Sequence, residues 1–293
     1  MSYKSFFSMF FIIFLWVFTL PLMFAICIIC LPVGSILLTV SYIISVYVQW
    51  YYQENIIANG IMRKIFSKIP FESWFESYTV HKTPAENGII LAHPHGILCC
   101  GMVIYHFKNN KTVMAVAPIL FYIPIFGWMA RSCGLIPATN NMIKKALIEK
   151  YNVILYVGGI EELIAHENNQ LYIKKRWGYL KIIKDLKPNI TIAWIKGESQ
   201  TFFLPPLPFL NLRQYTSKKF GFAIMFPWIF GWNSIWIPKP VPLQVTFKVL
   251  PSPESFQLTE LKKWYHSNLL QLIRQVYGEE SKETLHYQKF VQM

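Results

Sequence analysis

The sequence predicts an α/β fold, with a central sheet flanked by helices, that follows a membrane-embedded helical hairpin. Two observations predict it. Residues 6–53 contain no charged side chain, whereas the rest of the 293-residue chain alternates short apolar runs with helical patterns. A bilayer crossing needs about 20 apolar residues. Alternating strands and helices are typical of a largely parallel sheet that is covered on both faces.

The charge-free run is long enough to enter or cross a membrane twice. A proline and a glycine interrupt it at 31–35, so we expect two helices, over Phe6–Cys30 and Ile36–Trp50. A single slanted span stays open as an alternative. Residues 1–52 are therefore predicted to form a membrane hairpin.

The charges that flank the hairpin predict its orientation. Lys4 precedes it, and Arg63, Lys64 and Lys68 follow it. Basic residues remain on the cytosolic side of a membrane. We therefore expect residues 53–278 to form a cytosol-facing domain, and a single span would instead place that domain on the other side.

Within this domain, apolar runs of strand length recur between helical patterns. The spacing of apolar residues predicts helices at 141–150, 177–186 and 258–277, and an amphipathic helix near the membrane interface at Gln53–Ser67. We expect residues 279–293 to be a loose C-terminal tail. The predicted strands are 88–92, 112–117, 152–157, 190–195 and 243–250.

Net charge and cysteine usage limit the partners and the compartment. The net charge is +13, and Lys4 is the one charged residue among the first 50, so the domain is strongly basic. Such a domain favours an anionic membrane surface or a phosphorylated co-substrate. Zinc-finger spacing and a basic helix with heptads are both missing, which argues against nucleic acid. The odd number of cysteines, five, favours free thiols in a reducing compartment.

Two later segments are unusually apolar for a soluble surface. They are Phe202–Leu210 and the tryptophan-rich, uncharged Phe220–Pro238. Tryptophan prefers the boundary between headgroups and hydrocarbon. We interpret both segments as membrane-facing loops that wall an apolar pocket, with ordinary core packing as the alternative.

The tetrapeptide His93-Pro94-His95-Gly96 places two imidazoles at the end of a predicted buried strand. An imidazole is well suited to take a proton from an alcohol near neutral pH. Two hydrogen-bonded structural imidazoles are the main alternative. A metal site is less favoured because no third ligand is visible. Cys99 and Cys100 follow closely, but their apolar setting favours inert thiols over a Cys–His nucleophile.

A diglycine turn, Gly158-Gly159, links the strand at 152–157 to a predicted helix that starts with Glu161 and Glu162. The turn is similar to a phosphate cradle, but two carboxylates would repel an anion and suit the helix dipole instead. A carboxylate at this point can orient a histidine and stabilise its protonated form. Helix capping alone is the alternative.

A basic cluster, Lys174-Lys175-Arg176, comes shortly before Gly178 and Lys181. Arginine and lysine bind phosphate groups well. The cluster therefore predicts an anion-binding site, with a solvated basic helix face as the alternative.

These motifs occur in the order and approximate spacing seen in the type-2 diacylglycerol acyltransferase family, which includes monoacylglycerol and wax-alcohol acyltransferases. The chain resembles that family over about residues 50–277. Tyr179 stands where phenylalanine is usual. The motifs that carry the resemblance are the 93–96 tetrapeptide, Gly158-Gly159-x-x-Glu162, Arg176-x-Gly178-Tyr179 and Gly197-Glu198.

The resemblance implies an acyl-CoA-dependent O-acyltransferase of lipid biosynthesis, with a fold similar to that of the glycerolipid acyltransferases. It implies an endoplasmic reticulum membrane location, with the catalytic domain in the cytosol, and the lipid droplet surface as a further site. Diacylglycerol is the expected acceptor and triacylglycerol the product; monoacylglycerol or a long-chain alcohol is the alternative. Acyl-CoA is a co-substrate, and neither a cofactor nor a metal is implied. A non-catalytic lipid-binding membrane tether and a homo-oligomer stay open.

The resemblance also implies roles for single residues. His95 is expected to remove the proton of the acceptor hydroxyl without an acyl-enzyme, and Glu162 to hold that imidazole. His93 would orient the acceptor, although the choice between the two histidines is open. Backbone N–H groups of Gly96, Gly158 or Gly159 would stabilise the oxyanion. The residues expected to bind acyl-CoA are Lys174, Lys175, Arg176, Gly178 and Lys181.

Overall fold

A computed structural model describes residues 55–123, 126–159, 177–203, 237–253 and 257–291, with residues 35–36, 39–44, 47, 162, 171, 205, 212, 215 and 231 in addition. The predicted hairpin, residues 1–52, therefore lies almost wholly outside the described residues. So do Lys174, Lys175 and Arg176, and most of the apolar segments 202–210 and 220–238. None of the helices in the described part of the chain has the length and apolar character needed to cross a bilayer.

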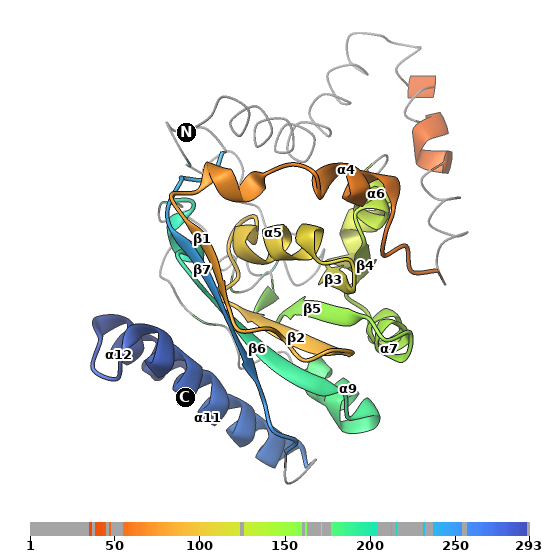
Figure 1. The fold of residues 1–293 in the computed structure, drawn as a ribbon. Helices are drawn as coiled ribbons and strands as arrows, with labels where there is room; N and C mark the ends of the chain where they lie inside the picture. The colour runs from red at the N-terminus through yellow and green to blue at the C-terminus, as the bar shows by residue number, and fades with distance from the viewer. Residues whose placement is uncertain are drawn as a thin grey trace.

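The centre of the molecule is a seven-stranded sheet with the strand order β1-β7-β6-β2-β5-β3-β4 (Figure 1). The five strands from β6 to β4 are parallel, whereas β7 pairs antiparallel with β6 and parallel with β1. All five predicted strands are confirmed, and β1 and β4 are additional. The strands are β1 (Tyr78–His81), β2 (Gly88–His93), β3 (Thr112–Val116), β4 (Leu135–Pro137), β5 (Asn152–Tyr156), β6 (Asn189–Lys196) and β7 (Leu243–Val249).

Helices cover both faces of the sheet, which confirms the predicted α/β class (Figure 1). On one face lie α4, α5 and α6, and on the other lie α9, α11 and α12. The predicted helices at 141–150, 177–186 and 258–277 are confirmed as α7, α9 and α11. The helices are α4 (Ile61–Phe66), α5 (Cys100–Lys108), α6 (Phe126–Ser132), α7 (Asn140–Ile148), α9 (Gly178–Leu186), α11 (Leu258–Tyr277) and α12 (Lys282–Val291), with short 3₁₀ helices at η2 (Phe71–Trp74), η3 (Pro118–Tyr122) and η5 (Glu198–Gln200).

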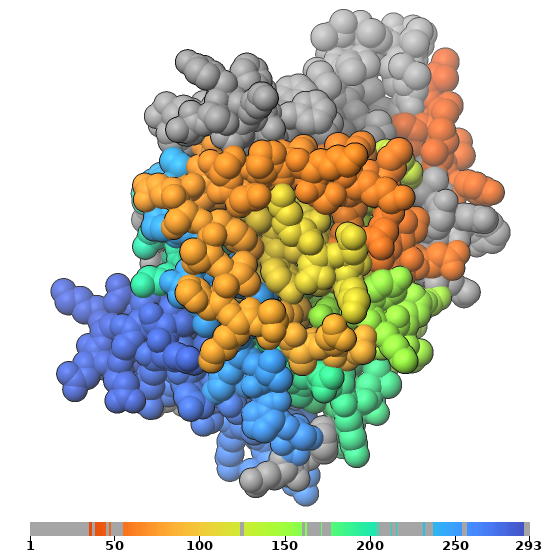
Figure 2. All heavy atoms as spheres, viewed as in Figure 1, coloured from red at the N-terminus to blue at the C-terminus, as the bar shows by residue number. Residues whose placement is uncertain are grey.

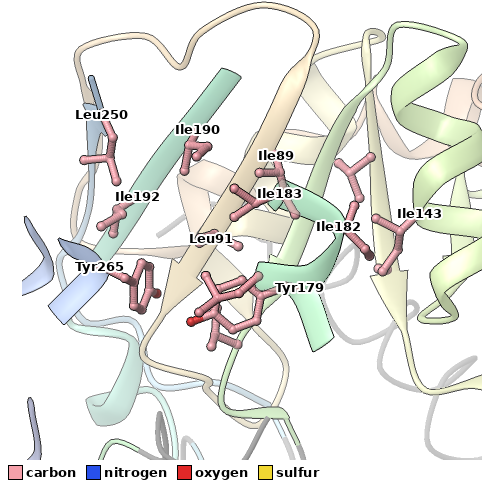
Figure 3. Close-up of a cluster of buried hydrophobic side chains, with 14 of the residues drawn as sticks. Ile89, Leu91, Ile143, Tyr179, Ile182, Ile183, Ile190, Ile192, Leu250 and Tyr265 are labelled. Carbon is pink, nitrogen blue, oxygen red and sulfur yellow. The ribbon is translucent and has the colours of Figure 1, made fainter. Parts of the chain in front are cut away.

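The alternation of side chains along β2 divides the core into two clusters. Ile89 and Leu91 pack with α7, α9 and α11, whereas Ile90 and Ala92 pack with α5 and α6. All six residues of β2 are buried, as expected for a parallel strand covered on both faces. Figure 3 shows the first cluster, in which Tyr179 of α9 and Tyr265 of α11 lie on the same side of the sheet as Leu91.

Two predictions about the ends of the domain were wrong. The helix predicted over Gln53–Ser67 is reduced to α4, because residues 55–60 are not helical. Gly60, which precedes α4, packs so closely on Ser132 that a Cβ at this position would collide with the Ser132 backbone. The tail predicted to be loose contains α12. Ser281 caps this helix by accepting a hydrogen bond from the Thr284 N–H at 3.0 Å.

The second helix of the C-terminal pair is fixed by aromatic packing. The Tyr287 ring meets the buried Trp194 ring edge-on, with 4.9 Å between centroids. The spheres in Figure 2 show α11 and α12 in blue at one corner of the molecule, with the orange and yellow residues of α4 and α5 in a different part of the same view. The C-terminal segment is therefore part of the folded domain.

Candidate active site

Three parallel, neighbouring strands end at the same edge of the sheet. His93 is the last residue of β2, Gly158 follows β5, and Gly197 follows β6. Ligand sites of open parallel sheets lie outside the carboxyl ends of the strands. The sequence motifs at 93–96, 158–162 and 197–198 are therefore brought to one place in the fold.

Glu162 lies at the centre of this arrangement with 2% of its surface exposed. Its Oε1 accepts a hydrogen bond from the backbone N–H of His95 at 2.7 Å. Its Oε2 lies 3.8 Å from Nδ1 of His93, an ion-pair rather than a hydrogen-bond distance. Burial works to raise the pKa of Glu162, but the neighbouring His93 and His95 outweigh it and hold the pKa below its ordinary value. Glu162 is therefore an ionised carboxylate at neutral pH.

His93 is enclosed by protein groups and has no exposed surface. Its Nε2 lies 2.5 Å from the hydroxyl oxygen of Tyr265, and its Nδ1 faces Glu162. A tyrosine hydroxyl that donates to Nε2 places the ring proton on Nδ1, toward the carboxylate. Both nitrogens of His93 therefore face the protein.

His95 is half-buried and its ring has a different environment. Its Nδ1 lies 2.8 Å from the carbonyl oxygen of Gly96. Because a carbonyl only accepts, Nδ1 carries the proton in the neutral ring, and Nε2 carries the lone pair that a general base needs. The ring packs 4.8 Å from the ring of Tyr156. Of the two imidazoles, His95 thus has the tautomer and the partial exposure of a base.

Cys99 is also close to His95, with its Sγ 3.7 Å from Nδ1. Burial raises the pKa of the Cys99 thiol well above its ordinary value. A thiol that stays protonated is a poor nucleophile. The contact therefore agrees with the prediction that this cysteine is inert.

A second buried carboxylate, Glu198, packs against Gly96 of the same turn and binds the start of α5. Its two oxygens accept hydrogen bonds from the N–H groups of Cys100 and Gly101, at 2.8 and 2.9 Å, where α5 begins. A Cβ on Gly96 would collide with this carboxylate, so glycine is required there. Burial raises the pKa of Glu198 to about 7, although both hydrogen bonds oppose the shift. Gly197-Glu198 is one of the motifs that carry the family resemblance, but the residues around it predict no role for Glu198.

The diglycine turn makes room for Glu162. A Cβ on Gly158 would collide with the Glu162 carboxylate, and Gly159 has a φ of 54°, in the left-handed region that favours glycine. The turn therefore explains how a carboxylate can lie directly against the backbone at the end of β5.

The predicted acyl-CoA residues are only partly placed. Lys174, Lys175 and Arg176 lie outside the described residues. Gly178 starts α9, and Lys181 is on the exposed side of that helix. The neighbouring Tyr179 ring packs edge-on against the Tyr265 ring, with 5.5 Å between centroids, so the start of α9 joins the site through α11.

Tyr265 is the site residue that the sequence analysis missed altogether. It lies 172 positions from His93 in the sequence, within a regular amphipathic helix, and no local pattern marks it. In the part of the chain that the structure describes, no group of three or more His, Cys, Asp or Glu side chains gathers as metal ligands do.

A half-buried imidazole with a bonded Nδ1 lies next to a carboxylate at the carboxyl edge of a parallel sheet, an arrangement that can support general-base chemistry. The family model described as diacylglycerol acyltransferase matches residues 35–236, and the chain belongs to this family.

Similar proteins agree with this assignment. Human 2-acylglycerol O-acyltransferase 3 is 26% identical over 278 residues, which cover 84% of this chain and 80% of that protein. Human 2-acylglycerol O-acyltransferase 1 is 24% identical over 299 residues, covering 85% and 84%. Diacylglycerol O-acyltransferase 2 of Danio rerio is 26% identical over 134 residues, covering 41% and 37%.

Among solved structures, the 1-acyl-sn-glycerophosphate acyltransferase of Thermotoga maritima overlaps with a TM-score of 0.47 at 14% identity, covering 73% of this chain and 78% of that chain.

Proposed function

We propose that this protein is an acyl-CoA-dependent O-acyltransferase that esterifies diacylglycerol to triacylglycerol, with His95 as the base. The observation that carries the proposal is the arrangement at the end of β2. The His95 ring donates from Nδ1 to the Gly96 carbonyl, and the ionised Glu162 binds the backbone of the same residue. Membership of the diacylglycerol acyltransferase family supplies the reaction class.

In the proposed reaction, Nε2 of His95 takes the proton of the acceptor hydroxyl while the alkoxide oxygen attacks the thioester carbonyl. The tetrahedral oxyanion then collapses, the carbon–sulfur bond breaks, and the protonated His95 returns its proton to the thiolate of coenzyme A. The products are an ester and free coenzyme A. A thioester is already electrophilic, and the neighbouring Cys99 thiol stays protonated, so an acyl-enzyme is not required.

The charge of Glu162 stabilises the imidazolium that forms during this step. His95 contributes electrostatically to the lowered pKa of Glu162, and the interaction acts equally in the other direction. The contact differs from a carboxylate–imidazole pair, because the hydrogen bond of Glu162 goes to the backbone N–H of His95. Glu162 thus fixes where His95 lies and favours its protonated form.

The remaining parts of the proposal concern the substrates and the membrane. Acyl-CoA phosphates would bind the basic residues 174–176 and Lys181 from the cytosol, and the lipid acceptor would enter from the endoplasmic reticulum membrane or a lipid droplet surface. The N–H groups of Cys100 and Gly101 already bind Glu198, so an oxyanion would need other donors. Those of Gly96, Gly158 or Gly159 are the proposed ones.

Monoacylglycerol is a second candidate acceptor. The relatives named 2-acylglycerol O-acyltransferase match 84% and 85% of this chain, whereas the Danio rerio diacylglycerol enzyme matches 41%. The longer matches favour monoacylglycerol as an acceptor, and the family description favours diacylglycerol.

The experiment offers one radiolabelled acyl-CoA together with equal amounts of diacylglycerol, 2-monoacylglycerol and a long-chain alcohol to microsomes that contain the protein. Lipid products are then separated by chromatography. We expect labelled triacylglycerol as the main product, and none from a His95→Ala variant that is present at the same protein level. Labelled diacylglycerol as the main product would select the second candidate. Lipid binding without any labelled product would overturn the enzymatic proposal in favour of a membrane tether.

A further inference from the structure

We propose that Tyr265 is a positioning residue of the active site, which holds His93 and, through it, the carboxylate that fixes the base. This inference rests on the proposed function. The residue lies on α11, beyond residue 236, where the match to the family ends. The helix α11 would then take part in acyl transfer without contacting a substrate.

The first link is the contact between Tyr265 and His93. Tyr265 has no exposed surface, and its hydroxyl oxygen lies 2.5 Å from Nε2 of His93. The two groups are completely buried, so a missing partner would leave a polar atom without a hydrogen bond. The hydroxyl donates to Nε2 and thereby sets the tautomer in which Nδ1 carries the proton.

The next links lead to the base. Nδ1 of His93 lies 3.8 Å from Oε2 of Glu162, an electrostatic contact without a hydrogen bond, and Oε1 of Glu162 accepts a hydrogen bond from the backbone N–H of His95 at 2.7 Å. Without the Tyr265 hydroxyl, the His93 ring can adopt the other tautomer and present a lone pair to the carboxylate. Glu162 would then face a lone pair in place of the N–H group of His93. Its carboxylate would be held less firmly, and so would the backbone of His95 that it binds.

The packing of α11 keeps Tyr265 in place. Its ring lies edge-on to the Tyr179 ring (Figure 3). Leu261, Leu269 and Leu272 of the same helix are fully buried. This helix is therefore a rigid support, and the position of the hydroxyl is set by the core rather than by a loop.

Tyr105 provides a control outside the site. It is a half-buried tyrosine of α5 whose ring lies 4.9 Å from the Phe247 ring and whose hydroxyl accepts a hydrogen bond from the Asn109 side chain at 2.9 Å. Tyr265→Phe and Tyr105→Phe each remove one oxygen atom and one hydrogen bond and keep the ring. A role in core packing alone predicts similar results for the two variants, and a positioning role predicts a difference.

The experiment measures acyl-CoA-dependent ester formation and thermal unfolding for the full-length protein and both variants. We expect Tyr265→Phe to lower kcat about tenfold, the effect of losing one buried hydrogen bond in the transition state, with KM for acyl-CoA changed less than about twofold. Tyr105→Phe should leave both constants unchanged. In a His93→Gln background, Tyr265→Phe should lower kcat by less than about twofold, because the partner is already lost.

Three results would overturn the inference. The first is an unchanged kcat in Tyr265→Phe while the wild type is active, which leaves the proposed function intact. The second is an equal loss in Tyr105→Phe, which would assign the effect to packing. The third is a full tenfold loss in the His93→Gln background, which would show that Tyr265 does not act through His93. A wild-type protein that transfers no acyl group to any acceptor would instead overturn the proposed function, and this inference with it.

Discussion

Glu162 and Glu198 are two buried carboxylates that contact the same turn, and yet their pKa values are shifted in opposite directions. Both are at most 2% exposed, and both accept hydrogen bonds from backbone N–H groups. Glu162 has two imidazoles beside it, and its pKa lies below the ordinary value. Glu198 has no such neighbours among the causes of its shift, and burial raises its pKa to about 7.

The comparison teaches that burial alone does not decide whether a carboxylate is ionised; its neighbours do. Glu162 keeps its charge because its contacts with His93 and with the backbone N–H of His95 hold its pKa low, and a fixed negative charge stabilises a base that becomes protonated. Glu198 accepts hydrogen bonds from two N–H groups at the start of α5, and a carboxyl group can act as an acceptor in its ionised and in its protonated form. We therefore assign an electrostatic role to Glu162 and a structural one to Glu198.

Replacing each carboxylate by its amide gives the largest expected difference. Glu162→Gln removes the charge that stabilises protonated His95, so turnover should fall about 100-fold or more while KM for acyl-CoA stays within about threefold. Glu198→Gln keeps one acceptor for the N–H groups of α5, and turnover should fall less than about tenfold. Steady-state kinetics with radiolabelled acyl-CoA measure both. A pure loss of acyl-CoA affinity in Glu162→Gln would make this residue a binding or capping group.

The glycines against which the carboxylates pack should sharpen the contrast. Gly158→Ala displaces Glu162, and Gly96→Ala displaces Glu198, because the new Cβ occupies the place of the carboxylate. Each should destabilise the fold by about 1–3 kcal/mol. Gly178→Ala is the control for stability, since its Cβ would approach only Asn140, at 3.9 Å. Thermal unfolding in detergent tests this, and equal melting temperatures for all three variants would contradict the packing described here.

The pH dependence of stability should differ in sign for the two groups. The folded pKa of Glu198, about 7, lies above its ordinary value of 4.5, so its contribution to stability is complete below 4.5 and is lost as the pH rises through 7. Glu162 has a lowered folded pKa, so its contribution is present above 4.5 and is lost as the pH falls through the folded pKa.

A further prediction follows from this sign. Glu198→Gln should flatten the fall in stability between about pH 5 and pH 7, by up to about 1.4 kcal/mol per pH unit for one proton. Denaturant unfolding at a series of pH values measures the slope. A wild-type slope that the substitution leaves unchanged would show that Glu198 does not titrate in this range.

The sequence predicts the covered part of the sheet well and its edges poorly. Strands such as β2 are buried on both faces, so they form continuous apolar runs. The edge strand β1 is mostly exposed and β4 has three residues, so neither gives a pattern. The helix α12 was missed because its composition is polar, although Ser281 three residues before Thr284 is a capping signal.

The candidate site divides in a similar way. The motifs at 93–96, 158–162 and 197–198 follow the ends of strands, and parallel topology brings them together. The different roles of His93 and His95 could not be predicted, because the two residues look equivalent in sequence. Only the fold places Tyr265 against one of them and the Gly96 carbonyl against the other.

The release of free coenzyme A by the wild type, His95→Gln and His93→Gln, with diacylglycerol as acceptor, tests the central claim most directly. The account predicts that His95→Gln abolishes release at an unchanged melting temperature. It predicts that His93→Gln retains measurable release, since that ring faces Tyr265 and Glu162 rather than a substrate. Wild-type turnover in His95→Gln would contradict the account.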